Sequence, residues 1–288
     1  MRRLTNDLIE ISLIPEVGGK IISLKNRCSG HEWIWHPQAA PEFRRPEPDA
    51  DFASTNLGGI DECLPTVKAQ SHGGFHFSDH GQVWRLPASV KEVTDDRITL
   101  ETVLTEAPLR FIRTVALEGP TVHFQYALEN LSDQPVPFIW AFHPLLRIEA
   151  GDRIEIRPDP IPTRVDCVAN LPGCLENEPF AWPRISGEID LTKPPVEGDP
   201  AFCTKLFFKS RIQNTATLVS AAYSEKLTLN WSGEDCPYFG LWLTCGAWNG
   251  HTHLAFEPTN HPSDLFMAPS PPLLNPRATT HWQITMSL

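Results

Sequence analysis

The chain has 288 residues, a formal net charge of −11 at pH 7, 41% hydrophobic residues and 20% charged residues, a composition typical of a folded globular protein. Its length fits one large β domain or two smaller domains. No cluster of lysine and arginine exceeds two adjacent residues, and no apolar run approaches the roughly 20 residues of a membrane helix, so we expect neither a nucleic-acid-binding protein nor a membrane protein.

At the N-terminus, Arg2 and Arg3 are not followed by the apolar stretch of a secretory signal, because Glu10 and Ser12 interrupt Leu8–Ile14. A cytoplasmic location is therefore expected.

Short segments in which apolar and polar residues alternate recur along the chain, separated by 28 prolines and 17 glycines. A period of two is the pattern of half-buried antiparallel strands. The predicted strands are Leu8–Ile14, Lys20–Lys25, Ile98–Leu104, Phe111–Leu117, Val122–Leu128, Phe138–Phe142, Leu227–Trp231, Phe239–Thr244, His253–Phe256 and Trp282–Met286. Since no segment has a helical period, the predicted fold is an all-β sandwich or barrel, with residues 1–288 as a single domain.

Two segments predict irregular structure. Pro37–Ser54 contains four prolines and charges of both signs, and Pro158–Pro200 is rich in proline and glycine. Loops of this length are often lids over a functional site, but plain surface excursions are an equal alternative here.

Four segments carry polar groups in apolar or glycine-rich surroundings: Gly58–Thr66, Ser78–Arg85, Trp140–Leu146 and Leu254–His261. In the last two, an apolar strand ends on a titratable residue followed by proline. A histidine and a carboxylate at such positions are rarely buried unless they are paired, and an apolar site makes a carboxylate a better base. Tryptophans in or near these segments suit the C–H face of a sugar. Before any resemblance is considered, any one of these histidines is more often a core or surface residue.

A metal site is the less favoured interpretation. The residues His72, His76 and His80 are spaced by four, but the glycines among them make a helix improbable. A second group combines His251, His253 and His261 with Glu257. Neither group shows the converging ligands and supporting carboxylates of a zinc site, so we expect no metal and no cofactor. Hydrolase and phosphate-binding glycine motifs are also missing from the sequence.

Taken in order, the motifs resemble the aldose 1-epimerase (galactose mutarotase-like) family. The ordered set is Gly58–Thr66, Asp79-His80-Gly81, Phe142-His143-Pro144 and Phe256-Glu257-Pro258. The resemblance extends from about Ile9 to Met286. It implies a large antiparallel β-sandwich of the galactose mutarotase-like type with a shallow sugar cleft.

The resemblance also implies roles for individual residues. Glu257 corresponds to the general base, His143 to the general acid and His80 to a second substrate-binding histidine. Trp242 is similar to a pocket aromatic residue of the family. For the sugar-contacting arginine and aspartate of the family, the candidates are Arg85 and Asp61.

The implied activity is interconversion of the α and β anomers of a small-molecule sugar by acid and base catalysis. Two alternatives stay open, because fold does not fix function. One is a non-catalytic carbohydrate-binding or sugar-sensing protein. The other is a hexose-phosphate 1-epimerase, which would require cations in the cleft, with Arg44, Arg45 and Arg85 as candidates. The oligomeric state is not predicted.

Overall fold

The computed structural model describes residues 1–37, 42–47, 50–156, 163–169, 179–185, 189–208, 214–232, 236–266 and 270–288. These residues form strands, turns and loops without a helix, and all their strand pairs are antiparallel, which confirms the all-β prediction. None of the described residues belongs to a helix able to span a membrane.

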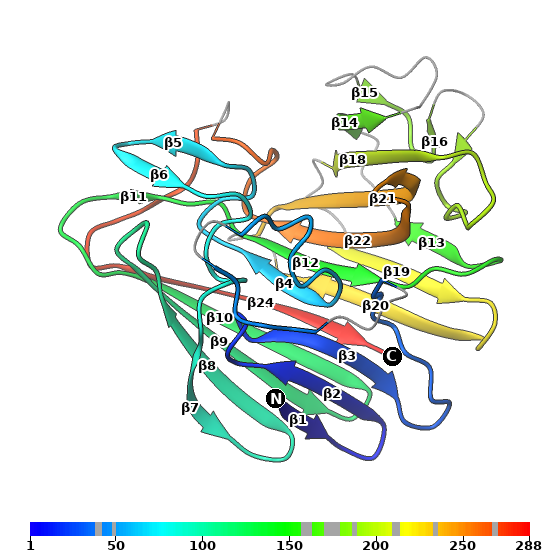
Figure 1. The fold of residues 1–288 in the computed structure, drawn as a ribbon, viewed down its shortest axis with the longest axis horizontal. Helices are drawn as coiled ribbons and strands as arrows, with labels where there is room; N and C mark the ends of the chain where they lie inside the picture. Colours follow the sequence, from blue (N-terminus) through cyan, green and yellow to red (C-terminus); the bar gives the residue numbers. More distant parts are fainter. Residues whose placement is uncertain are drawn as a thin grey trace.

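Two large sheets make up the fold (Figure 1). The ten-stranded sheet has the order β1 (Arg2–Thr5), β2 (Ile9–Ile14), β3 (Lys20–Asn26), β4 (Ile60–Cys63), β12 (Ala141–Leu146), β22 (His251–Thr259), β21 (Tyr238–Trp248), β18 (Phe202–Phe208), β14 (Thr163–Ala169) and β15 (Pro179–Phe180). The eight-stranded sheet has the order β13 (Arg153–Ile156), β19 (Thr215–Ser220), β20 (Glu225–Trp231), β24 (Thr279–Ser287), β10 (Thr121–Asn130), β9 (Leu109–Glu118), β8 (Arg97–Val103) and β7 (Ser89–Val93).

Three two-stranded sheets complete the described part of the chain. They pair β5 (Gln70–His72) with β6 (Phe75–Phe77), β11 (Val136–Pro137) with β23 (Leu273–Leu274), and β16 (Arg184–Ile185) with β17 (Ile189–Asp190).

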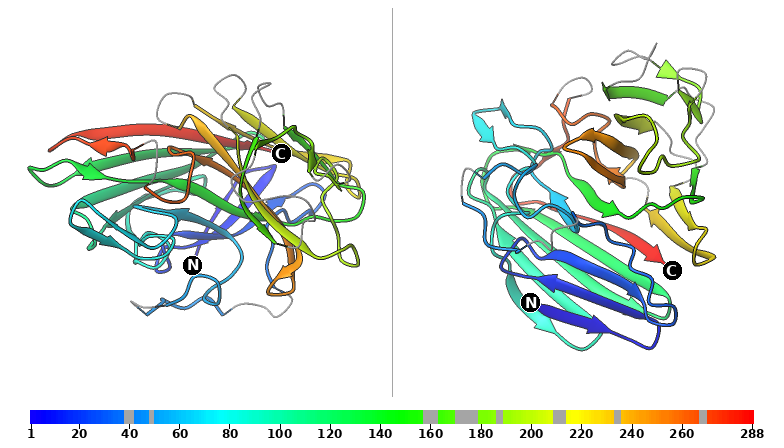
Figure 2. Two further views of the ribbon diagram at one scale, coloured as in Figure 1. Left: turned by 90° about the horizontal axis from the view of Figure 1, so that it is seen from above. Right: turned by 45° about the vertical axis from the view of Figure 1, so that its right-hand side comes forward.

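The two large sheets pack face to face as a sandwich. In Figure 1, β1, β2 and β3 lie over β8, β9 and β10, and the view from above in Figure 2 separates them into two layers. A single hydrophobic cluster contains residues of both sheets. Phe124 of β10 contacts Phe142 of β12 with a ring-centroid distance of 5.2 Å, and Tyr126 contacts Trp140 at 5.0 Å. The apolar face of each alternating strand thus forms the core.

Each predicted strand segment overlaps a strand of the structure. The irregular structure predicted for Pro158–Pro200 is wrong in part, because β14, β15, β16 and β17 lie within it. The strand β14 pairs with β18 and extends the large sheet, and Pro179 occupies the edge strand, where a missing N–H costs no ladder hydrogen bond. Residues 158–162, 170–178 and 186–188 of this prediction lie outside the described residues. The described residues of Pro37–Ser54 contain no strand.

Strand alternation gives the ten-stranded sheet two chemically different faces. Successive side chains of a strand point to opposite faces. In β12, Phe142 packs into the core, so His143 faces away from it. In β22, Phe256 belongs to the core cluster and Glu257 faces away from it. His143 and Glu257, which each follow a core phenylalanine, therefore lie on the outer face of this sheet.

Candidate functional site

The two residues predicted as acid and base are cross-strand neighbours. Ala141 pairs with Thr259 and Leu145 pairs with Ala255, and His143 and Glu257 lie between these two pairs on the neighbouring strands β12 and β22. The His143 Nε2 atom lies 4.0 Å from the Glu257 Oε1 atom. Both residues are buried, with 8% and 1% of their surface exposed. The backbone ladder thus brings together two groups that are far apart in the sequence.

A cavity of about 270 Å³ lies against this pair. Four predicted site residues, Glu257, His143, His80 and Trp242, line it. The other lining residues are Phe52, Ala53, Leu57, Val67, Lys68, Asp79, Leu145, Lys205, Trp248, His253 and Asp264. The structure therefore assembles most of the predicted constellation in one place.

His80 is held by a carboxylate and an aromatic ring. Its Nδ1 atom lies 2.7 Å from the Asp79 Oδ2 atom, and its ring stacks on Phe52 with a centroid distance of 3.8 Å and an interplanar angle of 7°. The edge-on contact between Phe52 and His143 has a centroid distance of 5.4 Å. Because the carboxylate holds the Nδ1 proton, the Nε2 atom of His80 is left to hydrogen-bond a ligand.

The two carboxylate oxygens of Glu257 differ in their hydrogen bonding. Lys205 donates a hydrogen bond to Oε2, whereas Oε1 is buried and has no hydrogen-bond partner within the described chain. Burial raises the pKa of Glu257, and the ammonium group of Lys205 opposes that rise. The free oxygen is the one that faces His143, so Oε1 is the atom available to accept a proton.

Lys205 bridges two carboxylates. Its Nζ atom contacts Glu257 and lies 3.7 Å from the Asp264 Oδ1 atom. Burial alone would lower the pKa of Lys205, but the charges of Asp264 and Glu257 raise it above its ordinary value. Lys205 is therefore an ammonium ion at neutral pH.

The surroundings of His143 disfavour its charged form. Burial, followed by the charges of His80 and Lys205, lowers the pKa of His143 well below its ordinary value. Its Nδ1 atom is also buried without a hydrogen-bond partner among the described residues.

An aromatic wall lines another side of the cavity. The Trp242 Nε1 atom donates to the His253 Nε2 atom at 3.3 Å, so the proton of the neutral His253 ring is on Nδ1. Burial lowers the pKa of His253 to about 3. Trp35 packs on His253 at a ring-centroid distance of 4.2 Å, and Trp248 lies edge-on to Trp242 at 5.9 Å.

Arg85 and Asp61 are not among the residues that line this cavity. Arg85 donates to Ser78 and Glu106, both at 2.7 Å, and lines a separate cavity. Asp61 is the cross-strand partner of His143 on β4, but its Oδ2 atom accepts a hydrogen bond from Lys20. Both charges are thus engaged by other protein groups.

The histidines considered as metal ligands diverge. In the first group, His72 packs edge-on against Phe266, His76 lies 2.7 Å from the Ser71 hydroxyl, and His80 lines the cavity. In the second group, His253 and Glu257 line the same cavity. No group of three or more potential ligands from histidine, cysteine, aspartate and glutamate gathers in the part of the chain that the structure describes.

Sequence reasoning missed Lys205, Asp264 and Phe52. A signal existed for Lys205, because it is the single charged residue of the apolar strand Phe202–Phe208, and lysine is rarely buried without a partner. Asp264 and Phe52 lie in loops whose sequence has no periodic pattern.

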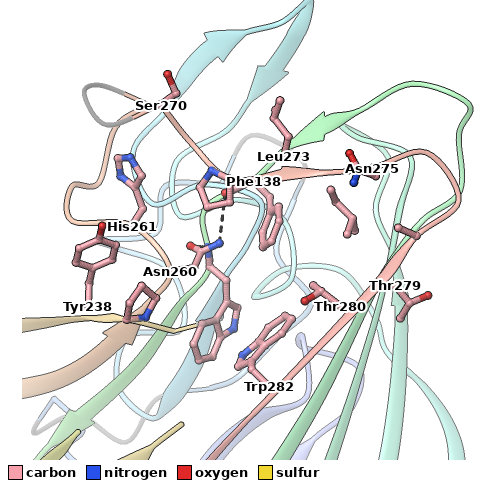
Figure 3. A pocket seen from close by; sticks show the side chains of 15 residues that line it. Phe138, Tyr238, Asn260, His261, Ser270, Leu273, Asn275, Thr279, Thr280 and Trp282 are labelled. Atoms are coloured by element: carbon pink, nitrogen blue, oxygen red, sulfur yellow. Dashed lines mark hydrogen bonds between the residues drawn. The ribbon is translucent and has the colours of Figure 1, made fainter. Parts of the chain in front are cut away.

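A larger cavity of about 510 Å³ lies elsewhere (Figure 3). Its wall contains Trp140, Tyr238 and Trp282, and Asn260 donates there to the Phe138 carbonyl oxygen at 3.5 Å. No aspartate, glutamate, lysine or arginine is among the described residues that line it. Without a carboxylate–histidine pair, this cavity is not the candidate for acid and base chemistry.

No protein-family model and no curated protein matches the chain. The fold matches solved structures along nearly its whole length. The Slr1438 protein from Synechocystis sp. PCC 6803 is 19% identical, with a TM-score of 0.72 over 99% of this chain and 94% of that protein. A galactose mutarotase-like protein from Lactobacillus casei ATCC 334 is 17% identical, with a TM-score of 0.70 over 100% and 99%.

A galactose mutarotase related enzyme from Lactobacillus acidophilus is 16% identical, with a TM-score of 0.68 over 99% of this chain and 96% of that protein. At such identities the similarity concerns the fold. The chain has the galactose mutarotase-like fold, as its ordered motifs predict.

Proposed function

We propose that this protein is an aldose 1-epimerase that interconverts the α and β anomers of a neutral sugar. The observation that carries the proposal is the unpartnered Glu257 Oε1 atom lying 4.0 Å from His143 Nε2 at a cavity with an aromatic wall. The anomeric hydroxyl and the ring oxygen of an aldose are bonded to the same carbon. Two groups that lie side by side, as these two do, can therefore act on both oxygens.

In the proposed reaction, Glu257 takes the proton of the anomeric hydroxyl while protonated His143 gives its proton to the ring oxygen. The bond between C1 and the ring oxygen breaks and leaves an aldehyde. After rotation about C1–C2, the freed hydroxyl attacks the other face of the aldehyde. His143 then recovers its proton and Glu257 returns its own, so the reaction needs no cofactor.

This mechanism requires that the one proton shared by Glu257 and His143 lies on His143 before the sugar ring opens. The active pair has an ionised Glu257 and a protonated His143, whereas burial favours a neutral form of each. The two groups therefore titrate as a pair, and the pH profile of turnover reports pair midpoints.

The cations near the cavity favour a neutral sugar over a sugar phosphate. Among the described lining residues, the cationic side chains are Lys68 and Lys205, and Lys205 is engaged by two carboxylates. Arg85 is paired with Glu106 in another cavity. A phosphate group would therefore meet one free ammonium group, that of Lys68, and the carboxylates of Asp79 and Asp264.

The test is NMR-followed mutarotation of a panel of neutral aldoses and their 6-phosphates, with the rate in buffer subtracted. We expect catalysis of at least one neutral aldose. A neutral sugar that binds without any rate above buffer would instead support the carbohydrate-binding alternative. A rate confined to the phosphorylated sugars would overturn the assignment of the substrate class.

A further inference from the structure

The buried ammonium group of Lys205 has no part in the proton transfers described above. Lys205 lies on β18, two strands away from Glu257 on β22. Only 5% of its surface is exposed. A buried lysine costs free energy unless it is paired. Its contacts with Glu257 and Asp264 supply that pairing.

Gly240 makes the contact possible. It lies on the strand between the two residues, paired with Glu257 on one side and with Phe207 on the other. A Cβ atom at Gly240 would lie 3.3 Å from both the Glu257 Cβ atom and the Lys205 Cε atom. Because Gly240 has no side chain, the Lys205 side chain has room to cross β21 and reach Glu257.

The proposal, which rests on the proposed function, concerns the orientation and charge of the base. We propose that Lys205 is a positioning residue that holds Glu257 Oε2, leaves Oε1 as the proton acceptor, and biases the shared proton towards His143. Asp264 moderates this effect by balancing part of the lysine charge.

Of the charged and titratable groups around Glu257, Lys205 has the most direct contact with its carboxylate. These groups are His143 on β12, Lys205 on β18, Cys63 on β4, and His80 and Asp264 from loops. Of these, Lys205 alone donates a hydrogen bond to the carboxylate in the described structure. Its removal should thus change the ionisation of Glu257 more than any other single substitution.

The test compares two substitutions of opposite sign. Lys205→Met removes a positive charge in contact with Glu257, so the carboxyl should titrate about 1–3 pH units higher than in the wild type. Asp264→Asn removes a nearby negative charge, so the Glu257 carboxyl should titrate at lower pH than in the wild type. Infrared difference spectra of the protonated carboxyl, assigned by its loss in Glu257→Gln, give these midpoints without any sugar.

The same variants should shift the pH profile of turnover in the directions of their infrared midpoints. In Lys205→Met, both midpoints of the pH profile should move to higher pH, and the maximal kcat/KM should fall about 10- to 1,000-fold, in step with the infrared shift. Lys205→Arg, which keeps the charge, should restore most of the profile. Gly240→Ala should displace the lysine and shift the midpoints in the same direction as Lys205→Met, by a smaller amount.

Outcomes separate this inference from the proposed function. Unshifted or equally shifted infrared midpoints in folded Lys205→Met and Asp264→Asn proteins would overturn the role of Lys205, whatever the activity. Opposite infrared shifts in a protein without mutarotase activity would uphold the lysine–carboxylate coupling and reject the epimerase. Circular dichroism confirms folding, and the infrared midpoint of Gly240→Ala, which displaces Lys205 without removing it, keeps the test decisive if Lys205→Met does not fold.

Discussion

At the scale of single residues, the central prediction concerns Glu257. In Glu257→Gln the shape of the side chain is kept, but an amide cannot accept the anomeric proton. Turnover should fall by at least about 10²-fold while sugar binding is largely kept. NMR-followed mutarotation gives the rate and calorimetric titration gives the affinity. Full activity in this variant would mean that another group is the base.

His253 gives a second residue-scale prediction, on stability. Its pKa is about 3 in the folded protein against an ordinary value of 6.5, so below pH 6.5 the unfolded chain binds a proton that the folded protein excludes. The stability that a neutral His253 contributes is complete above pH 6.5 and is lost as pH falls towards 3, by about 1.4 kcal/mol per pH unit.

His253→Gln stays neutral and isolates this effect. The difference in unfolding free energy, wild type minus variant, should be about 2 kcal/mol smaller at about pH 5 than at about pH 8. Urea denaturation at the two pH values measures it. A difference that is the same at both values would show that His253 is not held neutral by the fold.

The sequence could identify some site residues and not others for physical reasons. His143 and Glu257 each follow an apolar strand and precede proline, a local pattern that needs no knowledge of the fold. Arg85 and Asp61 are candidates through the family resemblance alone. Their partners Glu106 and Lys20 are distant in sequence, so nothing local shows that their charges are engaged.

At the scale of elements, strand prediction succeeded where one face of a strand is buried. In β10 the buried residues Val122, Phe124 and Tyr126 alternate with more exposed ones, and the period is visible. In β14 the alternation extends only over Arg164–Cys167, next to a proline-rich stretch, and the strand pairs with β18. Sheet order also depends on such long-range pairing, so the sequence alone did not predict it.

The loop that carries Phe52 gives an element-scale prediction. Phe52 stacks on His80, and an aromatic pair of this kind contributes about 0.5–1.5 kcal/mol beyond burial. In Phe52→Leu the apolar volume is largely kept and the stacking is lost, so KM should rise about 2- to 12-fold with a smaller change in kcat. Steady-state kinetics measure both constants.

A matched control is Phe75→Leu, which removes a stacked phenylalanine from the β5–β6 hairpin at 5.8 Å from Phe77. It should leave KM unchanged, because Phe75 does not line the cavity. An equal rise of KM in both variants would indicate a general structural effect.

At the scale of the whole molecule, a buried ion pair joins the two sheets. The Arg113 Nη1 atom of β9 lies 3.1 Å from Glu62 Oε1 of β4, and Tyr126 and Trp140 also donate to this carboxylate. Burial raises the pKa of Glu62 to about 7 despite the arginine. Arg113→Met would leave that carboxylate without its cation and should lower the unfolding free energy by about 3–5 kcal/mol.

The double variant Glu62→Gln with Arg113→Met removes both charges. It should be more stable than Arg113→Met alone, because no uncompensated charge stays buried. Urea denaturation of the wild type, both single variants and the double variant at neutral pH measures the coupling. Strictly additive losses would mean that the two residues stabilise the sandwich independently.

The strand pairing that brings His143 near Glu257 has a consequence for inactivation by heat. His143 pairs with Asp61 of β4 and Glu257 pairs with Gly240 of β21, so both residues belong to strands in the middle of the large sheet. Their backbones separate when that sheet opens, and central strands open near the global free energy of unfolding. The temperature at which catalysis is lost should therefore coincide with the temperature at which the sheet melts.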